Sequence, residues 1–299
     1  MNLPTILSDP DIDGVTRISS DPSLPRPHIG IFGAIHGNER CGIAVIERLL
    51  ERVRGGELGP TAGTWVLVHG NPGATEATRR YSRGGDDLNR LFDYAFIEEI
   101  PQERWSPEHL RALALRPVFD ELDVLLDLHS ATWPTPPFAI INDLPRSAEL
   151  ARRVGFDYVT EGWGQPGMLM EKVTIGAMKA RAKPALSVEC GQHDDPATVE
   201  AAWSCTLRFL AACGVLEGDA PAGDPLFLEI VDIVSRPSES FCFAREIRGL
   251  ERLQAGEVLA ADRIAELRVR EPCYVLMPND AVPVGRDMAF LARERQRER

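Results

Sequence analysis

Two short stretches of the sequence place metal-binding side chains directly after apolar runs. His36 and Glu39 follow a run that ends at Ile35, and His129 follows a second run that ends at Leu128. A histidine and a nearby glutamate can bind one ion through a nitrogen and an oxygen, and a distant histidine adds a third ligand. Three protein ligands leave a fourth position for water, as in catalytic zinc sites. The sequence therefore predicts one Zn²⁺ per chain, bound by His36, Glu39 and His129.

These three residues together are stronger evidence for a metal site than any one of them alone. A single His-x-x-Glu pair is commonplace, and a lone histidine after a strand is more often packed or hydrogen-bonded than bound to metal. All three residues follow strand-like runs, however, and α/β sheets gather their ligands at strand ends. Asp127 lies two residues before His129 and thus points to the same side of an extended strand. We expect Asp127 to orient a ligand or a substrate group.

Composition limits the class of protein and partner. The 299 residues are 44% hydrophobic and 26% charged, which fits a globular protein with one large or two unequal domains. No stretch approaches the roughly 18 apolar residues of a membrane span, and aspartates rather than basic residues precede Arg17, unlike a signal peptide. We expect a cytoplasmic protein with no membrane partner. The net charge of −12 argues against nucleic acid and favours a small-molecule substrate.

The cysteines point to neither a disulfide framework nor a thiolate metal site. The chain has 6 cysteines, scattered without any Cys-x-x-Cys spacing. They are expected to be small buried apolar residues. The oligomeric state stays open on this sequence, a homo-oligomer included.

Apolar segments alternate between short strand-like runs and longer runs with helical spacing. Strands are predicted at 29–35, 64–68, 123–128, 138–141 and 184–188, and helices at 40–53, 107–122, 147–154 and 196–213. This alternation predicts a layered α/β domain over residues 1–214. The following stretch is rich in turn residues and contains short β-type runs such as 226–231 and 273–277. A smaller β-rich domain is predicted over residues 215–299.

A cluster of arginines interrupts this acidic chain within one short stretch that contains glycines. Its members are Arg79, Arg80, Arg83 and Arg90. A guanidinium binds a carboxylate through two parallel hydrogen bonds, and a cation near a metal can stabilise an oxyanion. The cluster therefore predicts an anion-binding pocket. A solvated basic loop is the alternative, and it has more force for Arg79 and Arg83 than for Arg90.

Several motifs in sequence order resemble the succinylglutamate desuccinylase/aspartoacylase family. They are Gly33–Glu39, Asn71-Pro72, Arg80-Tyr81, Asp87–Arg90, Asp127–His129 and Ser187–Gly191. The resemblance implies a three-layer α/β/α core like that of zinc carboxypeptidases, with a smaller C-terminal β domain. It also implies zinc-dependent hydrolysis of an N-acyl amino acid to a carboxylate and a free amine. In this family the ligands correspond to His36, Glu39 and His129, and the general base to Glu189.

The position of Glu189 is compatible with that role. It ends the apolar run 185–188, from which a carboxylate can reach a water molecule at a metal. A solvated acid at a strand end would be the ordinary interpretation of an isolated glutamate. The predicted zinc site nearby favours the catalytic role.

The resemblance also implies substrate contacts. It assigns Arg80 to the scissile carbonyl, and Asn89 with Arg90 to the substrate carboxylate. The loop after Arg80 is two residues longer than in the family, so Arg83 is a second candidate for the carbonyl. The sequence leaves the choice between the two arginines open.

Two departures from the family concern the substrate. Lys179 lines up with the arginine expected to bind a substrate carboxylate, and Arg181 is close enough to compete with it. Pro283 stands where aspartoacylase supplies a substrate-contacting tyrosine. These differences predict that N-acetylaspartate is a poor substrate.

Three functions remain in competition. The first is hydrolysis of an N-acyl amino acid, and the second is a carboxypeptidase-like peptidase, which would need an open cleft for a peptide. The third is a metal-binding protein without activity, which should lack a base or an oxyanion arginine. Candidates for both are present, so the third has the least support. The segment 163–170, in which glycines flank large flexible side chains, suits either a covering loop or ordinary core packing.

Overall fold

The computed structural model describes residues 3–164 and 170–295. Within them, twelve strands form one mixed sheet in the order β1-β2-β4-β3-β5-β8-β6-β7-β9-β15-β14-β11. These strands are β1 Thr5–Ser8, β2 Val15–Ser19, β3 His28–Gly33, β4 Thr64–His69, β5 Val124–Ala131, β6 Phe138–Ile141, β7 Tyr158–Glu161, β8 Ala185–Gln192, β9 Leu226–Ser235, β11 Glu251–Leu253, β14 Cys273–Leu276 and β15 Asp287–Glu294. A smaller sheet contains β10 Cys242–Phe243, β12 Val258–Ala261 and β13 Glu266–Arg268.

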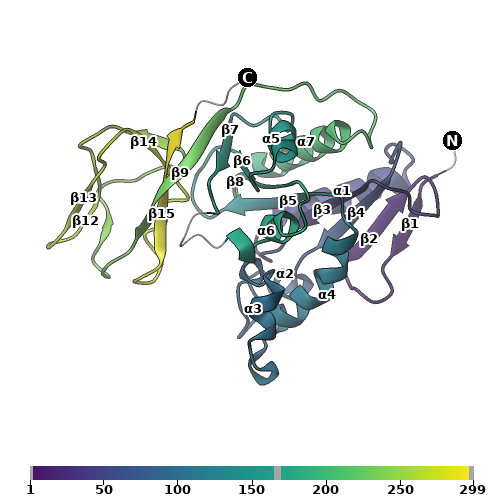
Figure 1. Ribbon diagram of the computed structural model, residues 1–299, viewed down its shortest axis with the longest axis horizontal. Helices are drawn as coiled ribbons and strands as arrows, with labels where there is room; N and C mark the ends of the chain where they lie inside the picture. Colours follow the sequence, from purple (N-terminus) through teal and green to yellow (C-terminus); the bar gives the residue numbers. More distant parts are fainter. Residues whose placement is uncertain (1–2, 165–169, 296–299) are drawn as a thin grey trace.

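Helices cover both faces of the central strands. The α-helices are α1 Arg40–Arg54, α2 Pro72–Glu76, α3 Tyr94–Glu98, α4 Pro107–Glu121, α5 Pro145–Ala151, α6 Thr174–Lys179 and α7 Ala197–Ala212. Apolar side chains of α1, α5 and α7 form one core cluster, and those of α3, α4 and α6 belong to a second cluster. Figure 1 shows these two groups on opposite sides of the sheet. The predicted layered α/β class is confirmed. None of the described helices has the length and apolar character needed to span a membrane.

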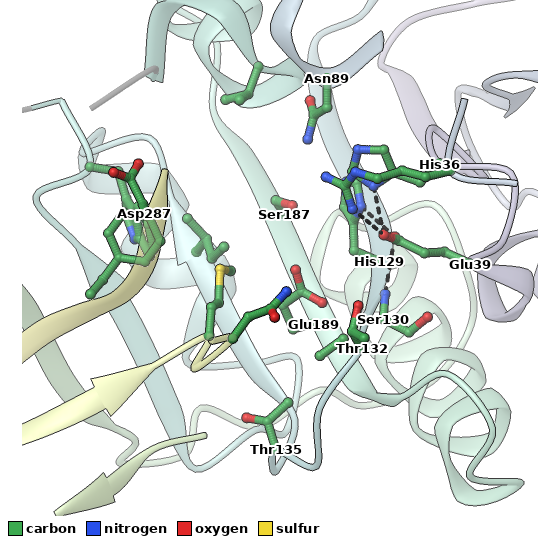
Figure 2. A pocket seen from close by; sticks show the side chains of 18 of the residues that line it. His36, Glu39, Asn89, His129, Ser130, Thr132, Thr135, Ser187, Glu189 and Asp287 are labelled. Atoms are coloured by element: carbon green, nitrogen blue, oxygen red, sulfur yellow. Dashed lines mark hydrogen bonds and ion pairs between the residues drawn. The ribbon is translucent and has the colours of Figure 1, made fainter. Parts of the chain in front are cut away.

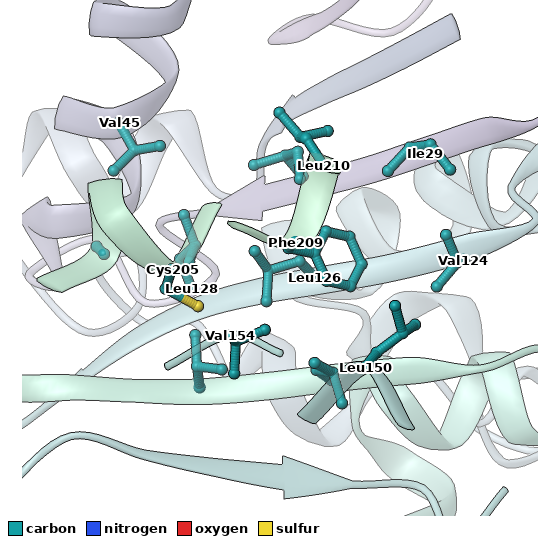
Figure 3. Close-up of a cluster of buried hydrophobic side chains, with 14 of the residues drawn as sticks. Ile29, Val45, Val124, Leu126, Leu128, Leu150, Val154, Cys205, Phe209 and Leu210 are labelled. Atoms are coloured by element: carbon teal, nitrogen blue, oxygen red, sulfur yellow. The ribbon is translucent and has the colours of Figure 1, made fainter. Parts of the chain in front are cut away.

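Alternation along β5 explains how one strand serves both the core and the site. Leu126 and Leu128 are fully buried in the cluster under α1 and α7, where Leu126 lies near Phe209 (Figure 3). Asp127 and His129 therefore point to the opposite face, because successive side chains of a strand alternate. Both neighbours of β5, β3 and β8, run parallel to it. A strand that is buried on both faces is usually apolar throughout. The buried polar residues Asp127 and His129 of β5 therefore indicate a functional site.

The β-rich C-terminal region extends the same sheet. Strand β9 pairs in parallel with β7, with Tyr158 opposite Leu226, and the antiparallel strands β15, β14 and β11 follow. A separate apolar cluster, which includes Leu259 and Met288, fills this region. Backbone hydrogen bonds thus cross the predicted boundary after residue 214. A division into domains 1–214 and 215–299 stays a prediction.

A close approach of two glycines places α1 against the sheet. A Cβ atom added to Gly42 of α1 would lie 2.5 Å from the Cα of Gly33, at the end of β3. Real Cβ atoms do not approach backbone so closely, so both positions need glycine. This contact fixes the loop between β3 and α1, which carries His36 and Glu39.

Gly42→Ala should reduce the free energy of unfolding by about 1–3 kcal/mol, since the new methyl group forces α1 away from β3. Urea unfolding followed by circular dichroism measures the change. Gly73→Ala is the matched control, because a Cβ there meets only the Ser82 hydroxyl oxygen, at 3.6 Å. An unchanged midpoint for Gly42→Ala would contradict the packing argument.

Candidate active site

The side chains of His36, Glu39 and His129 converge on one point. Glu39 Oε1 lies 2.7 Å from His36 Nδ1, and Glu39 Oε2 lies 2.7 Å from His129 Nδ1. One potential ligand atom from each residue lies within 4.8 Å of the others, and all three residues are buried. Figure 2 shows the three side chains pointing toward one another. The structure therefore brings together the three ligands predicted from the sequence.

The loop after β3 is shaped to deliver its two ligands. Ala34 has a φ of 53°, which is uncommon for a residue with a side chain and turns the chain sharply after the strand. A Cβ atom on Gly37 would lie 2.2 Å from the carbonyl carbon of Ala74. Glu39 stands immediately before α1, but its side chain does not cap that helix. The carboxylate is therefore free to face the histidines.

A second carboxylate fixes each histidine from behind. His36 Nε2 lies 2.9 Å from Asp87 Oδ1, and His129 Nε2 lies 2.8 Å from Asp127 Oδ2. Each Nε2–H can donate to its aspartate, and in a metal-bound state the unprotonated Nδ1 atoms would both face the ion beside Glu39. Histidines bound to metal commonly donate their second ring N–H to such a carboxylate. Two imidazole nitrogens with one carboxylate oxygen also form a donor set that catalytic zinc uses, so these residues fit a zinc ion.

The charges around the ligands favour a bound cation. Burial acts to raise the pKa of Glu39, but His36 and His129 hold it well below the usual range of a carboxyl group. Burial acts to lower the pKa of His129, yet Asp127 and Glu39 raise it well above the usual value of histidine. Positive charge at His129 is thus stabilised by two carboxylates. A metal ion at Nδ1 can supply that charge in place of a proton.

Glu189 faces the ligands from the neighbouring strand. In the parallel β5–β8 register Glu189 is the partner of His129, and both side chains line the same cavity. Burial, followed by the charge of Glu39, raises the pKa of Glu189 to about 7. Its Oε2 atom is buried and has no hydrogen-bond partner among the described residues. A half-buried carboxyl group that lines the cavity and has a pKa near neutrality can exchange a proton with a reactant.

The cavity in front of the ligands has a volume of about 250 Å³. Its described walls include Arg80, Asn89 and Arg90, together with an apolar side formed by Ile140, Trp163, Met170, Ile175, Met277 and Phe290. Arg80 donates to Asp87 Oδ2 at 3.0 Å, and its Nη1 lies 3.5 Å from Glu39 Oε1. Arg90 contacts no carboxylate within 4.0 Å in the described parts of the chain. A small molecule with one carboxylate and apolar groups would match these walls.

Some residues predicted for the substrate lie elsewhere. Arg83 is exposed and does not line the cavity. The ammonium group of Lys179 pairs with Asp143 at 2.9 Å, and Arg181 pairs with Asp120 at 2.7 Å. Neither side chain is part of the described cavity wall, since local ion pairs hold both outside it. Arg83 and Lys179 therefore do not line the described cavity, and their roles as substrate contacts stay predictions.

Two other sequence features lie partly outside the site or outside the described residues. Pro283 is exposed and does not line the cavity, whereas Pro278 and Asn279 do. The segment 163–170 includes 165–169, which lie outside the described residues. Its two ends, Trp163 and Met170, form part of the apolar wall.

Several residues of the site escaped the sequence analysis. Asp87 belongs to a motif noted there, but no role was assigned to it. His193 accepts a hydrogen bond from, or donates one to, Ser130 Oγ at 2.8 Å, and so supports the strand end beside His129. Asp287 lines the cavity from β15. The one sequence signal for His193 is that it follows Glu189 by four residues. No pattern in the sequence distinguishes Asp287.

Comparison with known proteins agrees with the geometry. The chain is 27% identical over 296 residues to succinylglutamate desuccinylase from Erwinia tasmaniensis. The aligned region covers 91% of this chain and 85% of that protein. Aspartoacylase from Xenopus tropicalis is 35% identical over 115 residues, or 36% of this chain and 35% of that protein. Both relatives are named for the removal of an acyl group.

A solved structure supports the fold. The crystal structure of succinylglutamate desuccinylase from Chromobacterium violaceum matches with a TM-score of 0.74 and 20% identity, over 95% of this chain and 89% of that chain. The model of the succinylglutamate desuccinylase/aspartoacylase catalytic domain matches residues 25–202, which is more than half of the sequence and includes all three ligand candidates and Glu189. The chain therefore belongs to the succinylglutamate desuccinylase/aspartoacylase family.

Proposed function

We propose that this protein is a zinc-dependent hydrolase that cleaves the amide bond of an N-acyl amino acid. The observation that carries the proposal is the placement of two histidine Nδ1 atoms and Glu39 opposite a buried, unpartnered Glu189 oxygen, inside one small cavity. A ligand set and a proton acceptor on adjacent strands are the minimal equipment for metal-assisted hydrolysis.

When bound, zinc supplies Lewis acidity, which polarises a carbonyl group and makes a water molecule acidic near neutral pH. Glu189 accepts a proton from the attacking water. The water oxygen then forms a bond to the acyl carbon, and the carbon–nitrogen bond breaks. Glu189 returns the proton to the departing nitrogen, so the products are a carboxylate and an amine.

Arg80 is positioned to act on the carbonyl oxygen. Asp87 holds its guanidinium close to Glu39, and the same aspartate orients His36. A fixed cation beside the ligands stabilises negative charge that develops on the carbonyl oxygen. We assign this role to Arg80 rather than Arg83, because Arg83 lies outside the cavity.

Arg90 is assigned to the substrate carboxylate. Its side chain donates one described hydrogen bond, from Nη1 to the backbone oxygen of Asn89 at 2.7 Å. The Asn89 side chain accepts from the backbone N–H of Thr174 at 3.1 Å, which fixes its orientation at the cavity. A guanidinium without a carboxylate partner, in a cavity of small-molecule size, is suited to bind one from the substrate.

A peptidase function has less support. A peptide substrate needs a cleft that continues past the cleaved bond, whereas this cavity is bounded by residues of the C-terminal strands, such as Phe290 of β15. Its volume of about 250 Å³ suits a small amide.

The purified protein should contain about one zinc ion per chain, and His129→Ala should lose most of it, since three protein ligands are needed for tight binding. Metal analysis after dialysis measures the content. His28→Ala is the control, because this histidine lies at the opposite end of β3 from His36 and its Nε2 donates a hydrogen bond to the backbone oxygen of Leu24 at 2.9 Å. Zinc retained at the native level in His129→Ala would refute the ligand assignment.

Glu189→Gln should lower turnover by about 10²–10⁴-fold while zinc stays bound, because glutamine keeps the shape of the side chain but cannot accept the proton. The rate of amine release is measured alongside the zinc content. Glu200→Gln on α7 removes a similar carboxyl group at an exposed surface position and should leave the rate unchanged. Native turnover in Glu189→Gln would exclude Glu189 as the base.

Arg90→Ala should lower kcat/KM for an N-acyl amino acid by about thirtyfold or more, through loss of a charge-assisted contact in a desolvated pocket. The same variant should barely change the rate for the matching compound that lacks the carboxylate. Arg83→Ala, in the same loop but outside the cavity, is the control and should behave as the native protein. Equal losses on both substrates would show that Arg90 does not bind the carboxylate.

A further inference from the structure

Two opposite charges face the cavity without pairing to each other. Arg90 and Asp287 both line it, yet no carboxylate oxygen of Asp287 lies within 4.0 Å of the guanidinium. Burial lowers the pKa of Arg90, and the charges of Asp87 and, to a smaller extent, Asp287 oppose that shift. The described partner of the Asp287 carboxylate is the Ser235 hydroxyl, which donates to Oδ1 at 3.2 Å. An anion and a cation separated in this way can each bind a complementary group of one ligand.

A bulge in β15 turns Asp287 toward the cavity. Asp287 and Phe290 are three residues apart, so in a regular strand they would point to opposite faces. The pairing of β15 with β9 shifts register between Asp287 and Ala289, and Met288 is fully buried in the C-terminal core. Both Asp287 and Phe290 therefore line the cavity. Bulges commonly re-aim a side chain beside a functional site.

An aromatic pair shares the cavity wall with this carboxylate. The rings of Trp163 and Phe290 pack edge to face with centroids 5.0 Å apart, and Trp163 Nε1 donates to Thr160 Oγ1 at 3.0 Å. The indole is thus held in place, and both aromatic residues line the cavity together with Asp287. A carboxylate next to aromatic rings attracts an ammonium group, through its charge and through the negative faces of the rings. Figure 2 shows Asp287 across the cavity from His36, Glu39 and His129.

The same wall is unfavourable for an acidic side chain. Among the described lining residues, the only guanidinium or ammonium groups belong to Arg80 and Arg90. Arg80 is already paired with Asp87, and Arg90 is assigned to one substrate carboxylate. A second carboxylate near Asp287 would lack a partner and meet a like charge, which costs binding energy.

We propose that Asp287, Trp163 and Phe290 form a subsite for a cationic group, so that the preferred substrate is an N-acyl amino acid whose side chain ends in an ammonium group. This inference rests on the proposed function and specifies its substrate class. Arg90 binds the α-carboxylate, and the side chain extends along the apolar wall to Asp287. The subsite discriminates by charge, and the aromatic rings accept the methylene groups of the chain.

Four substrates that share an acetyl group test the proposal. Nα-acetyl-lysine carries the ammonium group, Nα-acetyl-norleucine is its neutral counterpart, and Nα-acetylglutamate and N-acetylaspartate are acidic. We expect kcat/KM for the lysine compound to exceed that for norleucine by about tenfold, and both acidic compounds to be poorer than norleucine. The preference should weaken as salt is added, because Asp287 is exposed.

Asp287→Asn separates the subsite from the catalytic machinery. This nearly isosteric change should remove the preference for lysine by slowing that substrate about tenfold, with a much smaller effect on norleucine, whose side chain carries no charge. Asp232→Asn removes the same charge from an exposed position on β9, outside the cavity, and should change neither rate. Thermal unfolding of each variant checks that the fold is intact.

The outcomes distinguish the two proposals. Hydrolysis of norleucine with no preference for lysine, a preference for an acidic substrate, or a lysine preference that survives in Asp287→Asn would each overturn the cationic subsite and leave the amidohydrolase function standing. No hydrolysis of any N-acyl amino acid by the zinc-loaded protein would overturn both.

Discussion

The site depends on one buried carboxylate that two imidazole rings share. Glu39 is only 3% exposed, and a charge removed from water at this depth is strongly unfavourable unless neighbouring groups compensate it. The compensation comes from His36 and His129, from the backbone N–H of Ser130 at 3.3 Å, and from the guanidinium of Arg80. The histidines need partners in turn, which Asp87 and Asp127 provide. Carboxylates and imidazole rings thus alternate in a continuous series of contacts from Glu39, at the start of α1, to Asp127 on β5.

These residues meet in one candidate active site because the central strands of the sheet are parallel and adjacent. The loop after β3 carries two ligand candidates, β5 carries the third, and β8, next in order, carries Glu189. Parallel pairing aligns His129 with Glu189 at the same level of neighbouring strands. Residues on the other face of β5, such as Leu126, pack under α7 and hold the strand in place. One face of β5 therefore packs in the core, and the other face carries residues of the candidate site.

The sequence predicted the strands and helices that have a clear local pattern of apolar residues. Long apolar runs identified β3, β5 and β8, and helical spacing identified α1 and α7, because burial imposes those periods directly. The three ligand candidates and Glu189 follow such runs, so their convergence could be anticipated. Strands β1 and β7 escaped prediction, since polar residues interrupt both, whereas β6 is equally short but entirely apolar.

Long-range contacts explain the remaining differences. Lys179 was aligned with a substrate-binding position, but its ion pair with Asp143, 36 residues away, holds it outside the cavity. Asp287 became visible only in three dimensions, because a bulge decides which way it points and bulges leave a weak trace in sequence. Local sequence patterns therefore predicted the residues of the candidate metal site, whereas the opposite wall of the cavity depends on pairings between distant segments.

The continuous ladder between β7 and β9 has a consequence for self-association. Strand β9 covers the outer edge of β7, and thereby satisfies backbone N–H and C=O groups of the α/β part of the molecule. A shorter protein that ended at residue 214 would expose this edge as a template for strand addition by a second chain. Strand β9 of the β-rich region thus blocks the edge of β7 and prevents another chain from pairing with it.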